Sequence, residues 1–194
     1  MNTRESILAA VLKNQPPASP LPDISAFKGS RQDVVDNYQA VFTSIGGIVH
    51  VVNSFAEIND RIRANFDPTK RIITTLPAMA GYVELMSATA DPRTFDDVEL
   101  AVIDAQLAVA ENGAVWLPEQ HMGQRIIPYI CQHLAVVVPA EIIVPTLHEA
   151  YAQIGAGDYG FAAFIGGPSK TADIEQALVM GAHGPITMTV FILV

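Results

Sequence analysis

The feature that most constrains the fold is a repeated alternation of short apolar runs with segments of helical periodicity. The four clearest runs, at residues 48–52, 71–75, 98–103 and 134–138, are rich in Val, Ile and Thr, which suit a pleated, covered surface. Strands that alternate with helices favour a mostly parallel sheet with helices on both faces. We therefore expect an α/β fold with a mostly parallel sheet of about five to seven strands.

The helical segments have recognisable ends. Apolar residues recur at i, i+3 and i+4 over residues 31–45, and a Gly-Gly pair ends that pattern as a helix C-terminus should. In the next segment Ser54 can cap a helix, with Glu57 completing a capping box. A further helix is expected over residues 140–154.

The C-terminal stretch has the order strand, turn, helix, turn, strand. Residues 161–165 are an apolar run too short for a buried helix, and a Gly-Gly-Pro turn follows them. A helical pattern then covers residues 171–181, and residues 186–194 are rich in strand-forming types. Two such strands joined by a helix predict a right-handed parallel βαβ unit.

One antiparallel β-hairpin is expected within this fold. Residues 107–110 and 114–117 are strand-like, and they flank Asn112-Gly113. Asn-Gly is the dipeptide most favoured in a two-residue hairpin turn.

The N-terminal residues differ from the rest of the chain. Four apolar side chains lie at helical spacing, and the proline-rich stretch at residues 15–22 cannot continue a helix. We expect a helical arm and hinge over residues 1–24 and one domain over residues 25–194. A helix this short is marginal alone in water, so its apolar side should be buried on its own domain or on a neighbouring subunit, giving a homo-oligomer. The four apolar residues are Ile7, Leu8, Val11 and Leu12.

Composition limits the cofactors and partners. Cys131 is the single cysteine, so no intrachain disulfide can form and a four-cysteine iron–sulfur cluster cannot be held by this chain alone. A reducing cytoplasm is the natural setting. The formal charge of -9 argues against nucleic acid or an acidic membrane as partner. No apolar stretch approaches the length of a membrane-spanning helix.

The first candidate site is the turn that follows residues 161–165. In an open parallel sheet, ligands bind beyond the carboxyl ends of the strands. Gly166 and Gly167 allow close backbone approach, and Ser169 or Thr171 can cap the following helix. The free amides of such a turn favour an anion. The alternative is an ordinary glycine turn with a helix cap.

Charged residues near this turn bear on what it would bind. Lys170 would attract an anion, whereas Asp173 supplies competing negative charge near the expected helix start. His183 lies in the turn after the same helix. A helix of about ten residues is roughly 15 Å long, so Lys170 and His183 are not expected to touch one small molecule. For His183 we weigh local hydrogen bonding within the turn against a catalytic proton-transfer role.

Several short motifs carry a resemblance to a known family. They are Gly-Pro-Ser-Lys-Thr-Ala-Asp-Ile-Glu at residues 167–175, Gly-Ala-His-Gly-Pro at residues 181–185 and Ala-Glu-Asn-Gly at residues 110–113. With the opening segment at residues 3–8, they follow the order found in the LUD-domain family. The sequence resembles the lactate-utilisation protein C branch of that family, over nearly the whole chain.

The resemblance implies a cytoplasmic subunit of a system that converts L-lactate to pyruvate alongside iron–sulfur proteins. The chain has neither a dinucleotide fingerprint after its first strand nor the cysteines of a cluster. We therefore expect no cofactor on this chain, iron–sulfur clusters on its partner proteins, and an accessory role for the chain itself.

A second function follows from Glu111. The tripeptide Glu111-Asn112-Gly113 resembles the Glu-Asn-Gly of coenzyme A transferases, whose NagB/RpiA/CoA-transferase-like fold the LUD family is understood to share. In those enzymes the glutamate is the nucleophile, so the resemblance implies a stand-alone acyl-CoA transferase or hydrolase. In that case Asn112 and Gly113 would belong to the ligand site. The alternative is hairpin turn chemistry alone.

The remaining candidates carry less information. Cys131 and His133 are expected to alternate onto one face of a strand-like run, but a metal site needs further ligands and we expect none. Trp116, beside the hairpin, is interpreted as a packing residue.

Overall fold

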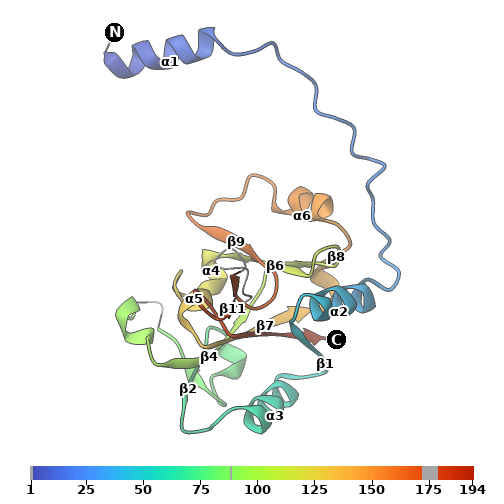
Figure 1. The fold of residues 1–194 in the computed structure, drawn as a ribbon, viewed down its shortest axis with the longest axis vertical. Coiled ribbons are helices and arrows are strands. Elements are labelled where there is room, and N and C mark those ends of the chain that lie inside the picture. The colour runs from blue at the N-terminus through green and yellow to red at the C-terminus, as the bar shows by residue number, and fades with distance from the viewer. Residues whose placement is uncertain (1, 88, 172–178) are drawn as a thin grey trace.

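A parallel sheet dominates the computed structural model, which describes residues 2–87, 89–171 and 179–194. In these ranges it has six strands in the order β1-β12-β7-β4-β2-β3, and every neighbouring pair is parallel. Figure 1 labels four of these strands, β1, β7, β4 and β2. The α/β class and the mostly parallel sheet are therefore confirmed. The strands are β1 (Ile48–Val52), β2 (Arg71–Thr74), β3 (Glu84–Leu85), β4 (Val98–Asp104), β7 (His133–Pro139) and β12 (Thr187–Leu193).

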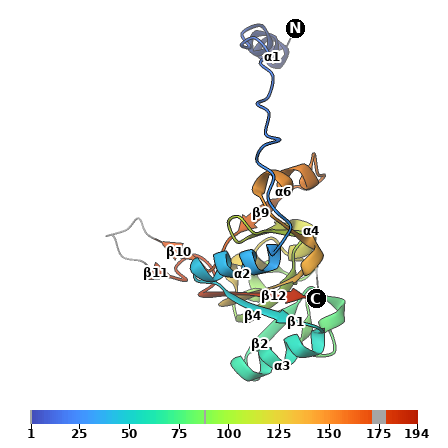
Figure 2. The ribbon, with the colours of Figure 1, turned by 90° about the vertical axis from the view of Figure 1, so that its right-hand side faces the viewer.

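Helices cover both faces of this sheet, as expected. On one face α2 buries Tyr38 and Phe42 in a core shared with β7 and β12, and on the other face α3 buries Ile58 and Ile62. Figure 2 shows α2 and α3 on opposite sides of the sheet. The helices are α1 (Thr3–Lys13), α2 (Val34–Ser44), α3 (Phe55–Asn65), α4 (Glu119–Met122), α5 (Ile127–Ile130) and α6 (Leu147–Ile154), with 3-10 turns η1 (Pro77–Met79), η2 (Pro92–Phe95) and η3 (Ala140–Ile142).

The expected hairpin is part of a larger second sheet. The hairpin strands β5 (Leu107–Val109) and β6 (Ala114–Pro118) lie between β8 (Ile143–Val144) and β9 (Ala162–Ile165) in the order β8-β5-β6-β9. One side of this sheet joins the core beneath α2, and α6 covers the other side. The expected hairpin is present, but it is not isolated. It has a partner strand at each edge and so forms the middle of a four-stranded sheet.

The C-terminal βαβ unit was predicted wrongly. Strand β9 pairs antiparallel with β6 in the second sheet, whereas β12 lies in the main sheet. Pairing with β6 places Phe164 against Trp116, with ring centroids 4.5 Å apart, and buries both sides of the hairpin. The ends of the expected helix form a small antiparallel pair, β10 (Lys170–Thr171) with β11 (Val179–Met180), and residues 172–178 lie outside the described residues.

The helix expected over residues 140–154 is shorter than predicted. Residues 140–142 form η3 and the next two form β8, and α6 begins only at Leu147. Pro145 is the reason, because a proline disfavours helical backbone in the residue before it. Thr146 then caps α6 by accepting a hydrogen bond from the Glu149 amide.

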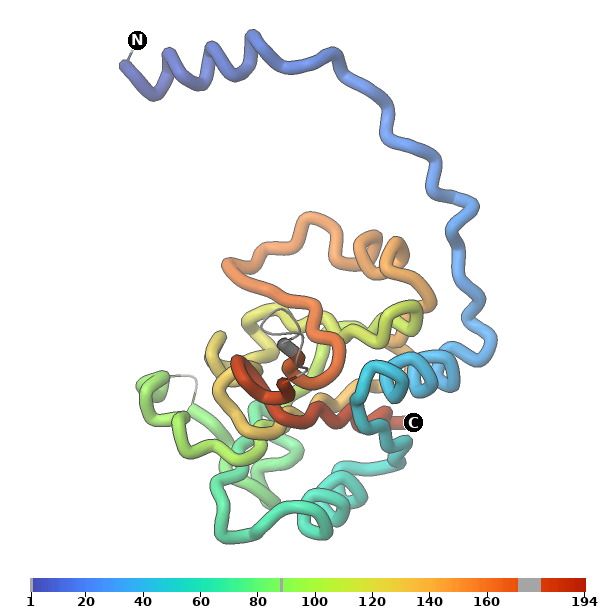
Figure 3. The backbone as a smooth tube through the Cα atoms, viewed as in Figure 1, coloured from blue at the N-terminus to red at the C-terminus, as the bar shows by residue number. Residues whose placement is uncertain are grey.

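The N-terminal helix α1 is not buried on the domain. None of its residues is buried, and the four apolar side chains of its expected inner face are 51–76% exposed. Figure 3 shows α1 at the end of an extended segment, away from the rest of the chain. Of the two expectations for the arm, burial on its own domain is wrong. Burial against a neighbouring subunit stays a prediction, as does the domain boundary near residue 24.

Candidate ligand-binding site

The glycine turn after β9 does not lie at the carboxyl end of the parallel sheet, because β9 belongs to the second sheet. Gly167 is buried with a positive φ of 78°, and a Cβ there would stand 3.1 Å from the carbonyl oxygen of Ile45. Gly166 is exposed but also faces Ile45, with its ideal Cβ 3.7 Å from the Ile45 side chain. These glycines let the turn approach the C-terminal end of α2, so their conformation has a structural cause.

The Lys170 side chain and backbone groups of the turn are bound within the protein. The Lys170 ammonium donates a hydrogen bond to the Ile45 carbonyl oxygen, at the C-terminal end of α2 where a positive charge is favourable. The Ser169 amide donates to the Pro185 carbonyl, and Thr171 pairs with Val179 in the β10–β11 hairpin. Asp173 lies outside the described residues.

His183 lies closer to the glycine turn than the expected helix allowed. A Cβ on Gly184 would stand 3.2 Å from the Cβ of Ser169, and the Gly181 amide donates to the Ser169 carbonyl. The turn that contains His183 therefore lies against Ser169, and the separation estimated from a straight helix is wrong. His183 itself is exposed.

Glu111 is hydrogen-bonded through its carboxylate to the start of α6. Its Oε2 atom accepts a hydrogen bond of 2.7 Å from the backbone amide of Leu147, the first residue of α6. Its own amide donates to the Pro145 carbonyl oxygen at 3.0 Å. The carboxylate is thus a cap that fastens the hairpin to α6.

The hairpin loop is longer than the two-residue turn expected from its Asn-Gly. Val109 pairs with Ala114, so four residues connect the strands. Asn112 Oδ1 accepts a hydrogen bond from the Ala114 amide, and Gly113 has the positive φ, 70°. A Cβ on Gly113 would stand 3.1 Å from both α2 and the Ile45 side chain. The structure therefore brings the hairpin tip and the glycine turn together around Ile45, where they pack.

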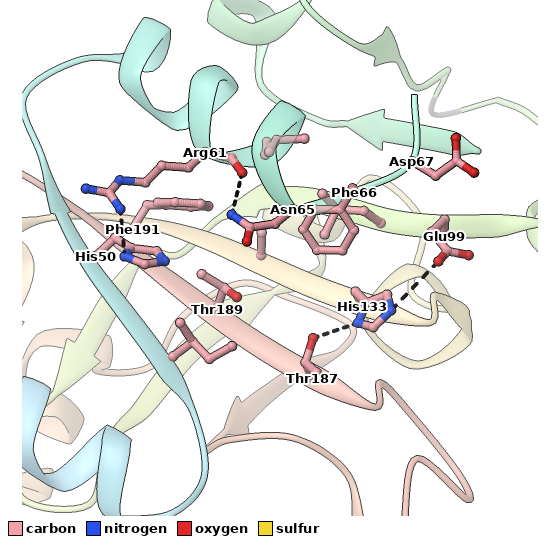
Figure 4. A pocket seen from close by; sticks show the side chains of 14 residues that line it. His50, Arg61, Asn65, Phe66, Asp67, Glu99, His133, Thr187, Thr189 and Phe191 are labelled. Carbon is pink, nitrogen blue, oxygen red and sulfur yellow. Dashed lines mark hydrogen bonds and ion pairs between the residues drawn. The ribbon is translucent and has the colours of Figure 1, made fainter. Parts of the chain in front are cut away.

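A pocket of about 570 Å³ lies elsewhere, on the face of the main sheet that α3 covers (Figure 4). Outward side chains of β1, β12, β7 and β4 form its floor, and the second half of α3 with Phe66 and Asp67 forms its wall. Side chains alternate along a strand, so Thr187, Thr189 and Phe191 of β12 share this face. Its volume and mixed lining are typical of small-molecule sites.

One end of the pocket carries hydrogen-bond donors. Arg61 on α3 lies 3.2 Å from His50 Nδ1 through its Nη1 atom and 3.5 Å from the Glu57 carboxylate through Nη2. Helix α3 begins at Ser54, whose side chain accepts from the Glu57 amide, and this start places Arg61 over β1. Burial, and then the nearby Arg61 charge, hold the pKa of His50 below its ordinary value. His50 is therefore neutral near pH 7.

The other end carries an imidazole between a hydroxyl and a carboxylate. His133 Nδ1 lies 2.7 Å from Thr187 Oγ1, and His133 Nε2 lies 3.8 Å from a Glu99 carboxylate oxygen. Phe66 packs edge-on against the imidazole, with ring centroids 5.2 Å apart. The Glu99 contact is longer than a hydrogen bond, so the Glu99 carboxylate can still accept a hydrogen bond from a donor that approaches from the pocket.

Sequence reasoning missed this pocket because its residues are spread over four strands and a helix. His133 was expected on the same face as Cys131, but Cys131 is buried in the core on the α2 side, where burial raises the pKa of its thiol to about 12. One signal in the sequence could have indicated the pocket. Thr alternates with buried apolar residues at the start of β12, and such alternation is typical of a strand with one sheet face only partly covered by helices.

Three further findings concern packing, metal binding and membrane spans. Trp116 packs against Phe164 and Tyr159, in agreement with its interpretation as a packing residue. Among the described residues, no group of three or more His, Cys, Asp and Glu side chains is arranged to hold a metal ion. No helix in the described ranges is both long and apolar enough to cross a bilayer.

These features define an α/β protein with a parallel sheet and a pocket on one sheet face. Residues 91–193 match the LUD domain family, and the chain belongs to that family. The match includes the pocket residues of β4, β7 and β12 but neither His50 nor Arg61.

Curated relatives and one solved structure agree with this assignment. The chain is 28% identical over 104 residues to lactate utilization protein C of Oceanobacillus iheyensis and 35% identical over 102 residues to lactate utilization protein C 1 of Bacillus mycoides. Each alignment covers 50% of this chain, and the chain spans 45% and 43% of those relatives. A crystal structure of a DUF162 family protein from Deinococcus radiodurans shares the fold, with a TM-score of 0.63 at 17% identity over 85% of this chain and 99% of that chain.

Proposed function

We propose that this protein is an accessory component of a cytoplasmic system that oxidises L-lactate to pyruvate. The redox steps in this proposal belong to partner proteins that hold iron–sulfur clusters. The observation that carries it is the match to several relatives named lactate utilization protein C, within the LUD domain that the chain contains.

The position of Glu111 supports the accessory role over the transferase alternative. A nucleophilic carboxylate needs open access to an acyl carbon. Here Oε2 of Glu111 accepts a hydrogen bond from the first amide of α6, which holds the carboxylate against that helix. The single cysteine supports the assignment of the clusters to partners, because a four-cysteine cluster needs ligands from elsewhere.

The test is growth on L-lactate as sole carbon source in cells that lack this protein. Wild type and Glu111→Gln should both restore growth, because Gln keeps an oxygen that can accept the Leu147 amide but cannot attack a thioester. A tagged copy should also co-purify with iron-containing partners from lactate-grown cells. Normal growth without the protein would contradict the proposal. Loss of growth with Glu111→Gln at unchanged protein level would favour the transferase.

A further inference from the structure

The pocket beside α3 combines two polar ends with an apolar middle. Thr189 and Ala135 lie on the floor between the ends, and Phe66, Phe191 and Ile62 supply apolar surface. At about 570 Å³ the pocket is far larger than an inorganic ion requires and falls in the range of organic ligand sites.

The Arg61 end is suited to an anion. His50 Nδ1 accepts from the Arg61 guanidinium, so the proton of the neutral imidazole is on Nε2, which becomes a donor. Figure 4 shows this second nitrogen turned away from Arg61. Arg61 Nε is buried with no hydrogen-bond partner among the described residues, so the donors that a ligand can reach are those of the two terminal nitrogens. Glu57 offsets part of the charge from the outer side, at 3.5 Å, and leaves the other guanidinium donors available.

The His133 end is suited to a hydrogen-bond donor. Glu99 and Asp67 give this end two carboxylates, and Thr187 holds one nitrogen of the imidazole. An anionic group would be repelled here, so the two ends select opposite parts of one ligand.

The register of the sheet sets the separation of the ends. His50 pairs with Phe191 and His133 pairs with Thr187, so the two histidines are two strands and four residues apart. With strand spacing near 4.8 Å and a rise near 3.3 Å, their Cα atoms are roughly 16 Å apart. A molecule of the size of lactate can contact only one end.

We propose that this pocket binds an elongated organic carboxylate, with its carboxylate at Arg61 and His50, an apolar body on Phe66 and Phe191, and a hydroxyl at Glu99 and His133. This binding site is independent of the proposed role in lactate use. Arg61 and His50 select the charge, and the aromatic side chains select the length and flatness of the body.

The experiment is a calorimetric titration of the full chain with para-hydroxyphenylpropanoate, which carries a carboxylate, an aromatic ring and a hydroxyl in line. We expect a Kd of about 1 mM or tighter. The matched neutral alcohol, para-hydroxyphenylpropanol, should bind about tenfold more weakly because it lacks the charge. Propanoate, which reaches only the Arg61 end, should also bind more weakly.

Single substitutions test whether the carboxylate binds at the Arg61 end of the pocket. Arg61→Gln should weaken binding of the carboxylate by about tenfold and leave that of the alcohol unchanged. Arg63→Gln removes the same charge from an exposed position of the same helix outside this pocket, so it should change neither. Thr189→Val, in the pocket floor, should weaken the carboxylate by a smaller factor, and it tests the site independently if Arg61→Gln does not fold.

Three results would overturn the proposal. They are no saturable binding of the carboxylate to the wild type, equal affinities for the carboxylate and the alcohol, and equal losses in Arg61→Gln and Arg63→Gln. The last result would show a general effect of net charge.

Discussion

The glycine turn and the pocket beside α3 differ in how their polar groups are used. At the turn, Lys170 binds the end of α2 and Glu111 of the adjoining hairpin binds the start of α6. In the pocket, each terminal nitrogen of Arg61 has one contact, with His50 or Glu57, and His133 lies beyond hydrogen-bonding distance of Glu99. Residues that look catalytic in sequence can also hold the fold together, and donors and acceptors that remain available within a pocket point to ligand binding.

This comparison predicts that substitutions at the turn cost stability, whereas substitutions in the pocket change binding. The largest effect is expected for Gly167→Ala. It adds a Cβ 3.1 Å from a carbonyl oxygen at a φ of 78°, and it should lower the free energy of unfolding by about 2 kcal/mol in denaturant titrations. The control is Gly81→Ala, where φ is not positive and the added Cβ meets nothing within 4 Å. It should change the free energy of unfolding by less than about 0.5 kcal/mol. Equal costs would mean that neither the backbone strain nor the close contact at Gly167 contributes to stability.

A smaller effect is expected at Glu111. Glu111→Ala removes the acceptor for the Leu147 amide and should lower the free energy of unfolding by about 1 kcal/mol, as loss of a helix cap does. Glu111→Gln retains an acceptor oxygen and should cost less than half as much. The two variants can be compared by thermal unfolding. If both lose activity without losing stability, Glu111 is catalytic and the capping interpretation fails.

Lys170→Met should cost about 0.5 kcal/mol, since an exposed cation at a helix C-terminus contributes little. The loss should shrink at high salt, which screens the interaction. Unfolding measured at low and high ionic strength checks this. If Lys170→Met leaves stability unchanged but abolishes anion binding, Lys170 is an anion-binding residue and the helix-capping interpretation fails.

The smallest effect concerns the pH dependence contributed by His50. Burial lowers the pKa of His50 in the folded state, so the unfolded chain binds the proton more readily. The contribution of His50 to stability is therefore complete above the unfolded pKa near 6.5 and is lost as the pH falls below it. His50→Gln should reduce the slope of stability against pH in that range. A His50 pKa above 6.5 by NMR titration would contradict the pocket geometry.

The helices and strands themselves were mostly predicted well from the sequence, but the strand with which residues 161–165 pair was not. The helix at residues 31–45 and the hairpin strands follow from periodicity and turn residues that lie near one another in the chain. The assignment of residues 161–165 to the main sheet failed because an apolar run does not specify which strand it pairs with. The expectation that the glycine turn lies at the carboxyl end of the main sheet depended on that assignment and is wrong, whereas a ligand role for the turn stays a prediction.

The sequence by itself determined the α/β class, the alternation of strands and helices, and the family to which the chain belongs. Tertiary structure decided which glycines and charges serve packing, and it assembled the pocket from β1, β4, β7, β12 and α3. The physical reason is that secondary structure depends on neighbours within a few residues, whereas Arg61, His133 and Thr187 come to line one pocket only through sheet register and helix packing across more than a hundred residues.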